Sequence, residues 1–156
     1  MTVDASVFVA VHELYGRWSH ALDTGHPDLV VDDFTPDGVL WVSDRGSYRG
    51  RDEIAEITRG RAGAVLHVIT NVIVEDATGD RARAHAYFHM VDMAAGQVVA
   101  RGMYDDDLVG AGGRWRWHRK AVDFLWRSDG YATKADQLRR PDYGRSPNPV
   151  GHFAAL

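Results

Sequence analysis

An aspartate and a histidine are the two residues of this chain whose types best fit together as a catalytic pair. Asp23 ends a run with helical periodicity, and His67 lies at the start of a run of β-branched residues typical of a strand. A carboxylate hydrogen-bonded to one imidazole nitrogen fixes the tautomer and makes the other nitrogen a better base. We therefore predict a catalytic pair of Asp23 and His67. The alternative is an aspartate that starts a turn and a histidine that is hydrogen-bonded within a core.

A basic pair on the last predicted strand, Arg119 and Lys120, could supply a positive charge. Because strand side chains alternate between faces, Arg119 shares a face with Trp115 and Trp117 unless a bulge shifts the register. Alternation therefore favours Arg119 as the cation that faces a pocket. A buried cation there would stabilise a developing negative charge. The alternative is a charged strand in contact with solvent.

Aromatic residues on the first helix and the strands are candidates to line a pocket for an apolar ligand. Asn71 joins them because, on a regular strand, it shares the face of His67. The candidate substrate-binding residues are Trp18, Trp41, Asn71, Tyr87, Tyr104, Trp115 and Trp117. For most of them the alternative is an ordinary core position.

Metal and cofactor chemistry are not indicated by the sequence. The chain has no cysteine, which excludes disulfides and thiolate catalysis. His85 and His89 share a strand face, but no third ligand follows at a useful spacing. The three aspartates at 105–107 lack the spacing of a calcium loop and are predicted to form a solvated strand end. Glycine-rich phosphate loops and nucleophile elbows are also missing, so we expect no metal and no cofactor.

The composition is that of one globular domain. The chain has 156 residues, of which 45% are hydrophobic, and a net charge of −4. It carries no basic field for nucleic acid. It also shows no signal-peptide pattern and no apolar run of the ~20 residues needed to cross a bilayer. We expect a cytoplasmic protein without nucleic-acid or membrane partners.

The order of the predicted elements indicates an α+β fold. A first helix ends near Asp23, a short helix covers 28–34, a turn covers 35–38, and a third helix starts at Gly50. Strands are predicted at 39–42, 65–75, 81–92, 97–108 and 114–126. Helices followed by a meander of strands predict N-terminal helices on a strongly curved, mostly antiparallel sheet, a cone-shaped barrel. This domain spans 1–127, and an irregular tail, 128–156, is expected to pack on its own barrel or on a neighbouring subunit.

Several short stretches in this order resemble the SnoaL-like members of the nuclear transport factor 2-like superfamily of α+β barrels. They are Leu14-Tyr15 with Ala21-Leu22-Asp23, Phe34-Thr35-Pro36-Asp37-Gly38, Gly46-Ser47-Tyr48-Arg49-Gly50, His67 with Asn71, Gly102-Met103-Tyr104, and Gly113-Arg114-Trp115-Arg116-Trp117. The resemblance covers about residues 5–127.

Within that superfamily the pattern is most similar to the Asp–His lyases: scytalone dehydratase, bile acid 7α-dehydratase and γ-hexachlorocyclohexane dehydrochlorinase. The resemblance places Asp23 and His67 on the catalytic dyad. It also implies a cation on the last strand, and ungapped alignment with the dehydrochlorinase favours Lys120, whereas face alternation favours Arg119. Trp18 stands where bile acid dehydratase has a tyrosine, so no general acid is assigned.

The resemblance implies a cofactor-independent lyase that performs a dehydratase-type elimination on a small hydrophobic, cyclic or polycyclic substrate. A steroid isomerase or polyketide cyclase of the same fold is the alternative, and a non-catalytic ligand-binding module is another. A relative of the small subunit of ring-hydroxylating dioxygenases is a further alternative. The same resemblance implies a homo-oligomer, with a trimer favoured over a dimer.

Overall fold

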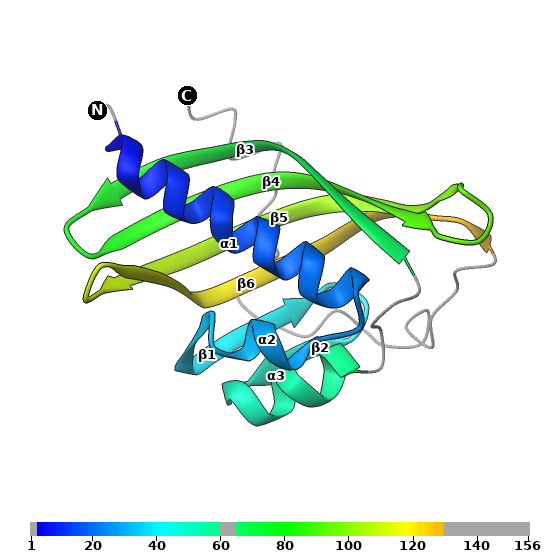
Figure 1. Cartoon of the computed structure of the whole chain (residues 1–156), viewed down its shortest axis with the longest axis horizontal. Helices are drawn as coiled ribbons and strands as arrows, with labels where there is room; N and C mark the ends of the chain where they lie inside the picture. The colour runs from blue at the N-terminus through cyan, green and yellow to red at the C-terminus, as the bar shows by residue number, and fades with distance from the viewer. Residues whose placement is uncertain (1–2, 60–64, 130–156) are drawn as a thin grey trace.

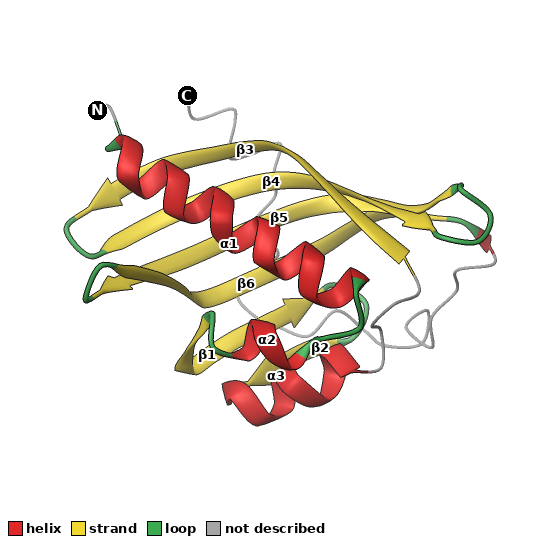
Figure 2. Ribbon diagram, in the orientation of Figure 1, coloured by secondary structure: helices red, strands yellow, loops and turns green. Residues whose placement is uncertain are grey.

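One curved, six-stranded sheet and three helices form the part of the chain that the computed structural model describes, residues 3–59 and 65–129 (Figures 1 and 2). The elements are α1 (Ala5–Asp23), α2 (Asp28–Val31), β1 (Phe34–Val42), β2 (Gly46–Arg49), α3 (Gly50–Arg59), β3 (Val65–Thr78), β4 (Arg81–Asp92), β5 (Val98–Ala111) and β6 (Arg114–Arg127).

The strand order is β2-β1-β6-β5-β4-β3, and every neighbouring pair is antiparallel except the parallel pair of β1 and β6. The four long strands after α3 follow one another as hairpins, as the turn residues between them predicted. Helix α1 lies diagonally across one face of these strands, and α3 lies beside β1 and β2 (Figure 1). The predicted α+β fold, with N-terminal helices on a mostly antiparallel sheet, is confirmed.

Helix α1 begins and ends where the sequence predicts. Asp4 caps it by accepting a 2.7 Å hydrogen bond from the Ser6 backbone N–H. Gly25, with φ at +79°, follows its last turn in the left-handed conformation that glycine adopts without strain. The buried face, with helical spacing, consists of Val11, Leu14, Tyr15, Trp18, Ala21 and Leu22. Burying this face holds Asp23, the last residue of α1, against the sheet.

Two predicted boundaries near β1 are wrong. The short helix α2 ends at Val31, and residues 35–38 belong to β1 instead of a separate turn. The turn residues still interrupt the pairing of β1 with β6. Phe34 pairs with Trp117, and the next paired residue of β1 is Val39, which lies opposite Arg119. Residues 35–38 therefore bulge out of the ladder, as expected where Pro36 has no N–H to donate.

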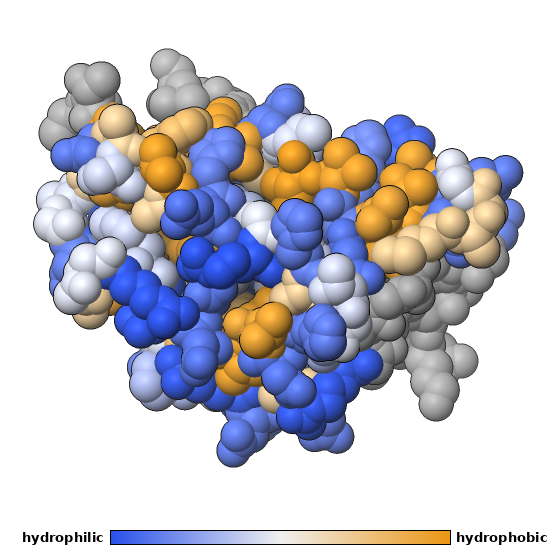
Figure 3. All heavy atoms as spheres, viewed as in Figure 1, coloured by the Kyte–Doolittle hydropathy of each residue, from blue (hydrophilic) through white to orange (hydrophobic). Residues whose placement is uncertain are grey.

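The surface around these elements is mostly polar. Figure 3 shows polar residues over most of the helical face, with apolar side chains gathered in smaller patches. On β3 the exposed apolar residues include Leu66, Val68 and Ile73. None of the helices in the described segments is long and apolar enough to cross a bilayer. The predicted tail lies outside the described residues from 130 onward, and the homo-oligomer and the cytoplasmic location stay predictions.

Gly102 on β5 should be intolerant of substitution, whereas Gly16 on α1 should not. A Cβ at Gly102 would lie 2.0 Å from the Asp123 carbonyl oxygen and 2.6 Å from the Phe88 ring. We expect Gly102→Ala to lower the free energy of unfolding by about 1–3 kcal/mol. Gly16 has no atom within 4 Å of its Cβ position, so Gly16→Ala should stabilise the helix by about 0.5–1 kcal/mol. Urea denaturation of both variants checks this, and losses of similar size would contradict it.

Candidate active site

The fold brings Asp23 and His67 into direct contact. The Nδ1 atom of His67 lies 2.6 Å from Oδ1 of Asp23. The backbone N–H of His67 also donates to both carboxylate oxygens, at 3.1 and 3.0 Å. The side chains of His67 and Asp23 are only 8% and 12% exposed. Helix α1 supplies the acid and strand β3 the imidazole, so the pair depends on the docking of α1 on the sheet.

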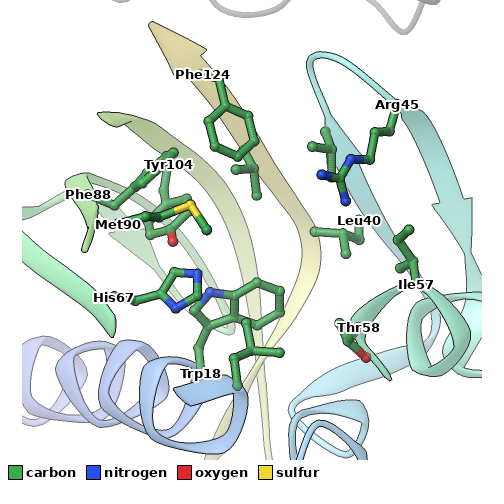
Figure 4. Close-up of a pocket in the computed structure, with 13 residues that line it drawn as sticks. Trp18, Leu40, Arg45, Ile57, Thr58, His67, Phe88, Met90, Tyr104 and Phe124 are labelled. Atoms are coloured by element: carbon green, nitrogen blue, oxygen red, sulfur yellow. The ribbon is translucent and has the colours of Figure 1, made fainter. Parts of the chain in front are cut away.

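This geometry decides which imidazole nitrogen is free. An ionised carboxylate can only accept, so Nδ1 of His67 carries the proton and Nε2 of the neutral ring keeps its lone pair. The His67 ring points into a pocket (Figure 4). A carboxylate at a helix C-terminus is disfavoured by the helix dipole, and the hydrogen bonds from His67 offset that cost. The arrangement is that of a base whose protonated form a neighbouring anion would stabilise.

A mostly apolar pocket lies in front of His67. It is bounded by α1, β1, α3, β4, β5 and β6, and the atom-free space around it, with open solvent at the mouth included, is about 550 Å³. Its lining residues are Trp18, Leu22, Leu40, Val42, Arg45, Ile57, Thr58, His67, Phe88, Met90, Tyr104, Val122 and Phe124.

Tyr104 brings a phenol to this pocket. It lies on β5, lines the pocket, and its hydroxyl oxygen points toward the His67 side of the space (Figure 4). Burial, with the nearby carboxylates of Asp106 and Asp23, raises the pKa of Tyr104. The hydroxyl therefore stays protonated and can donate a hydrogen bond to an oxygen of a bound molecule.

Lys120 lies beneath the pocket and does not line it. Its Nζ atom is 2.8 Å from Oδ2 of Asp106, and both side chains are completely buried. The same ammonium group lies 3.7 Å from the centre of the Tyr104 ring and 4.6 Å from that of Tyr15. Burial lowers the pKa of Lys120 to about 8, although the carboxylate of Asp106 opposes this shift. Two rings that this ammonium group faces, those of Tyr104 and Trp18, also line the pocket.

A bulge in β6 explains why Lys120 faces inward and Arg119 does not. Asp107 of β5 pairs with Arg119, but the next residue, Leu108, pairs with Trp117, which leaves His118 as an extra residue. Arg119 turns to the opposite sheet face, where Nε lies 2.7 Å from Oδ2 of Asp107. The face-alternation argument for Arg119 as a pocket cation is therefore wrong.

The structure places two of the predicted aromatic residues, Trp18 and Tyr104, on the pocket wall. Trp117 is fully buried under the pocket, where its Nε1–H donates to Asp106 at 3.0 Å. It supports the site from below and does not line it. Trp115 packs beside Gly110 near the start of β6, away from the pocket.

Three other predicted pocket residues point elsewhere. On β1, Leu40 and Val42 line the pocket, so the buried Trp41 between them faces the other side of the sheet. Tyr87 on β4 is 38% exposed on that same outer side. Asn71 has φ at +53° and sits where the pairing of β3 with β4 shifts register, which takes it off the face of His67.

Sequence reasoning missed Asp106 and Arg45. The aspartates at 105–107 were expected at a solvated strand end, but β5 continues to Ala111 and Asp106 is completely buried. Alternation from Tyr104 would have placed Asp106 on the inner face. Arg45 follows β1 in a turn, and no sequence pattern marks it as a pocket residue. Within the described segments, no group of three or more metal-ligating side chains is arranged around a metal site.

The sequence of residues 5–121 matches the SnoaL-like domain family. The chain belongs to this family. No curated protein sequence matches the SnoaL-like chain. The family match confirms the resemblance to SnoaL-like proteins found in the sequence.

Solved structures with similar folds carry several names. A protein from Novosphingobium aromaticivorans named as a candidate aromatic ring hydroxylase is 27% identical, with a TM-score of 0.69 over 80% of this chain and 93% of that chain. A protein from the same species named as a candidate scytalone dehydratase is 18% identical, with a TM-score of 0.73 over 92% and 99%. A hexachlorocyclohexane dehydrochlorinase is 13% identical, with a TM-score of 0.68 over 79% and 88%. The last two show a shared fold only.

The variant Lys120→Met should be strongly destabilising, and more so at higher pH. Removing one partner of a buried ion pair typically costs about 3–5 kcal/mol. Burial raises the pKa of Asp106 above 3.8, and the loss of Lys120 removes a charge that opposes this shift. The folded variant then holds a proton that the unfolded chain releases, so its stability falls by up to ~1.4 kcal/mol per pH unit above pH 4. Urea denaturation at pH 5 and pH 8 measures the difference.

Two further variants serve as controls for this ion pair. Lys120→Met combined with Asp106→Asn removes both charges, so it should recover stability and lose the pH dependence. Arg119→Met breaks ion pairs on the outer face with the half-exposed Asp107 and with Asp105, which keeps its pair with Arg83, so it should cost less than Lys120→Met. A Lys120→Met variant that is as stable at pH 8 as at pH 5 would contradict the buried-pair description.

Proposed function

We propose that this protein is a cofactor-independent lyase in which His67 is the general base and Asp23 is its positioning partner. The observation that carries the proposal is the 2.6 Å contact between Asp23 and Nδ1 of His67 at the edge of an apolar pocket. A binding module would not need the imidazole to be hydrogen-bonded to a carboxylate. The names of the fold neighbours, a candidate scytalone dehydratase and a dehydrochlorinase, support the same reaction class by analogy.

The proposed reaction is an elimination. Nε2 of His67 takes a proton from a substrate carbon, the C–H electron pair forms a new double bond, and the bond from the neighbouring carbon to the leaving group breaks. Asp23 stabilises the imidazolium that forms. Positioned base catalysis of this kind contributes roughly 10²–10⁴-fold to the rate.

Tyr104 has a separate role in this proposal. Because burial raises the pKa of its phenol, Tyr104 donates a hydrogen bond to a substrate oxygen without losing its proton. The acid that remains in the pocket is protonated His67. Delivery of its proton to a leaving hydroxyl group would release water and return the base to its starting state. This sequence requires the proton and the leaving group to depart from the same side of the substrate.

The pocket walls favour a hydrophobic, cyclic substrate. Trp18, Phe88 and Phe124 present aromatic surface, and Leu40 and Met90 add aliphatic surface. Planar or fused rings fit such walls better than a chain of polar groups. An isomerase or cyclase of the same fold would use the same base but conserve the substrate mass, whereas elimination lowers it. Mass spectrometry of the product separates the two.

A Kemp elimination tests the base directly. The probe 5-nitrobenzisoxazole is a flat bicyclic molecule whose C–H proton is removed by a base to open the ring, which is followed by absorbance. We expect His67→Ala to lower the rate by roughly 10²–10⁴-fold, because the base is lost. Asp23→Asn should lower it by about 10²-fold or more, because an amide can no longer fix the tautomer or stabilise the imidazolium.

Three further measurements accompany this experiment. Circular dichroism should show that each variant stays folded, and His89→Ala, on the outer side of β4, should keep the wild-type rate. The ¹⁵N spectrum of His67 should show the Nδ1–H tautomer in the wild type and lose that preference in Asp23→Asn. Folded variants with undiminished rates would show that His67 is not the base.

The variant Tyr104→Phe should slow the reaction and leave binding nearly unchanged. It removes one hydrogen-bond donor to an oxygen that gains charge in the transition state, which typically costs about 10²–10³-fold in kcat. The same probe measures kcat and KM, since ring opening develops negative charge on oxygen. If KM rises while kcat is unchanged, Tyr104 only binds the substrate.

A further inference from the structure

An arginine at the pocket wall has a buried donor without a protein acceptor. Arg45 follows β1, in the short connection to β2, and its side chain is only 12% exposed. Its Nε atom is buried and finds no hydrogen-bond acceptor. The nearest carboxylate oxygen, Oδ1 of Asp44, lies 3.6 Å from Nε, which is too long for a hydrogen bond. A guanidinium has five N–H donors, and burying it without acceptors is costly.

The neighbouring acid is already engaged by another arginine. Oδ2 of Asp44 contacts Nη2 of Arg127, whose side chain is 16% exposed. Asp44 therefore shares its charge between two guanidinium groups, so Arg45 does not have this carboxylate to itself. Such a site favours an additional anion, and the apolar surroundings strengthen the attraction.

The Arg45 side chain points into the pocket, so an anion that binds it would lie there. Figure 4 shows its guanidinium directed into the pocket toward Leu40, on the wall opposite His67 and Met90. Apolar side chains separate the two ends of the space. A ligand that contacts both ends would place its reacting carbon at His67, its rings between apolar walls, and an acidic group at Arg45.

We propose that Arg45 binds a carboxylate of the substrate, so that the substrate class is a cyclic hydrophobic acid. This inference rests on the proposed function for its reaction but not for its binding. Paired N–H donors of a guanidinium match the two oxygens of a carboxylate, which gives orientation as well as affinity. Holding the acid at one end positions the far end of the ring system against Nε2 of His67.

A matched pair of probes tests the charge preference. Naphthalene-2-carboxylate and naphthalene-2-carboxamide have the same shape and differ in charge, and their binding to the protein is measured by isothermal titration calorimetry. We expect the wild type to bind the carboxylate about tenfold or more tightly than the carboxamide. Arg45→Met should remove that preference and leave carboxamide binding nearly unchanged. Arg45→Lys should restore part of it, since a lysine keeps the charge and loses the paired geometry.

The controls separate this inference from the proposed reaction. Arg59→Met makes the same charge change at an exposed position, where Arg59 pairs with Asp28, and should keep the preference. His67→Ala should also keep it, although it abolishes the Kemp elimination. Equal affinities in the wild type, failure of both probes to bind, or a preference that survives Arg45→Met would overturn the Arg45 proposal. A Kemp elimination rate that His67→Ala leaves unchanged, together with an intact carboxylate preference, would overturn only the proposed reaction.

Discussion

The hydrogen bond between Asp23 and His67 is the interaction on which the site depends. It joins the last residue of α1 to the start of β3, so it forms only when the helix has docked across the sheet. The aspartate is unfavourably placed with respect to the dipole of its own helix. It becomes favourable through three hydrogen bonds from one residue, two of them from the backbone N–H of His67. The packing of α1 on the sheet therefore also sets the geometry of the Asp23–His67 pair.

A second layer of polar groups supports the pocket from below. Lys120 and Asp106 form a buried ion pair, and Trp117 donates a further hydrogen bond to the same carboxylate oxygen. The rings of Tyr104, Tyr15 and Trp18 surround the ammonium group. Because the charges are satisfied within the core, the apolar pocket can lie above them without an exposed charge on its floor. Lys120 lies on the last strand, where the resemblance to the Asp–His lyases implies a cation, and its ammonium group lies 3.7 Å from the centre of the Tyr104 ring.

Regular periodicity predicted the helices and strands well. It gave the wrong sheet face for residues at or beyond a β-bulge. The stripe of α1, the glycine after it and the hairpin turns were readable because each depends on local geometry alone. The errors at Arg119 and Asn71 both occur at bulges, where one extra residue reverses the face of everything beyond it. The predictions that Trp41 and Tyr87 line the pocket were wrong for a different reason. Hydrophobic strand residues can be buried or exposed on either face of a sheet, and the residue type does not say which.

The sequence by itself determined the α+β class, the order of helices and strands, and Asp23 and His67 as a candidate pair. Those properties follow from local periodicity, turn residues and a resemblance that covers about residues 5–127. Only the tertiary structure decided that the pair is in contact, that Lys120 instead of Arg119 faces inward, and that Arg45 points into the pocket. These outcomes depend on register shifts and on side chains from distant segments converging on one space, and neither leaves a signal in neighbouring residues.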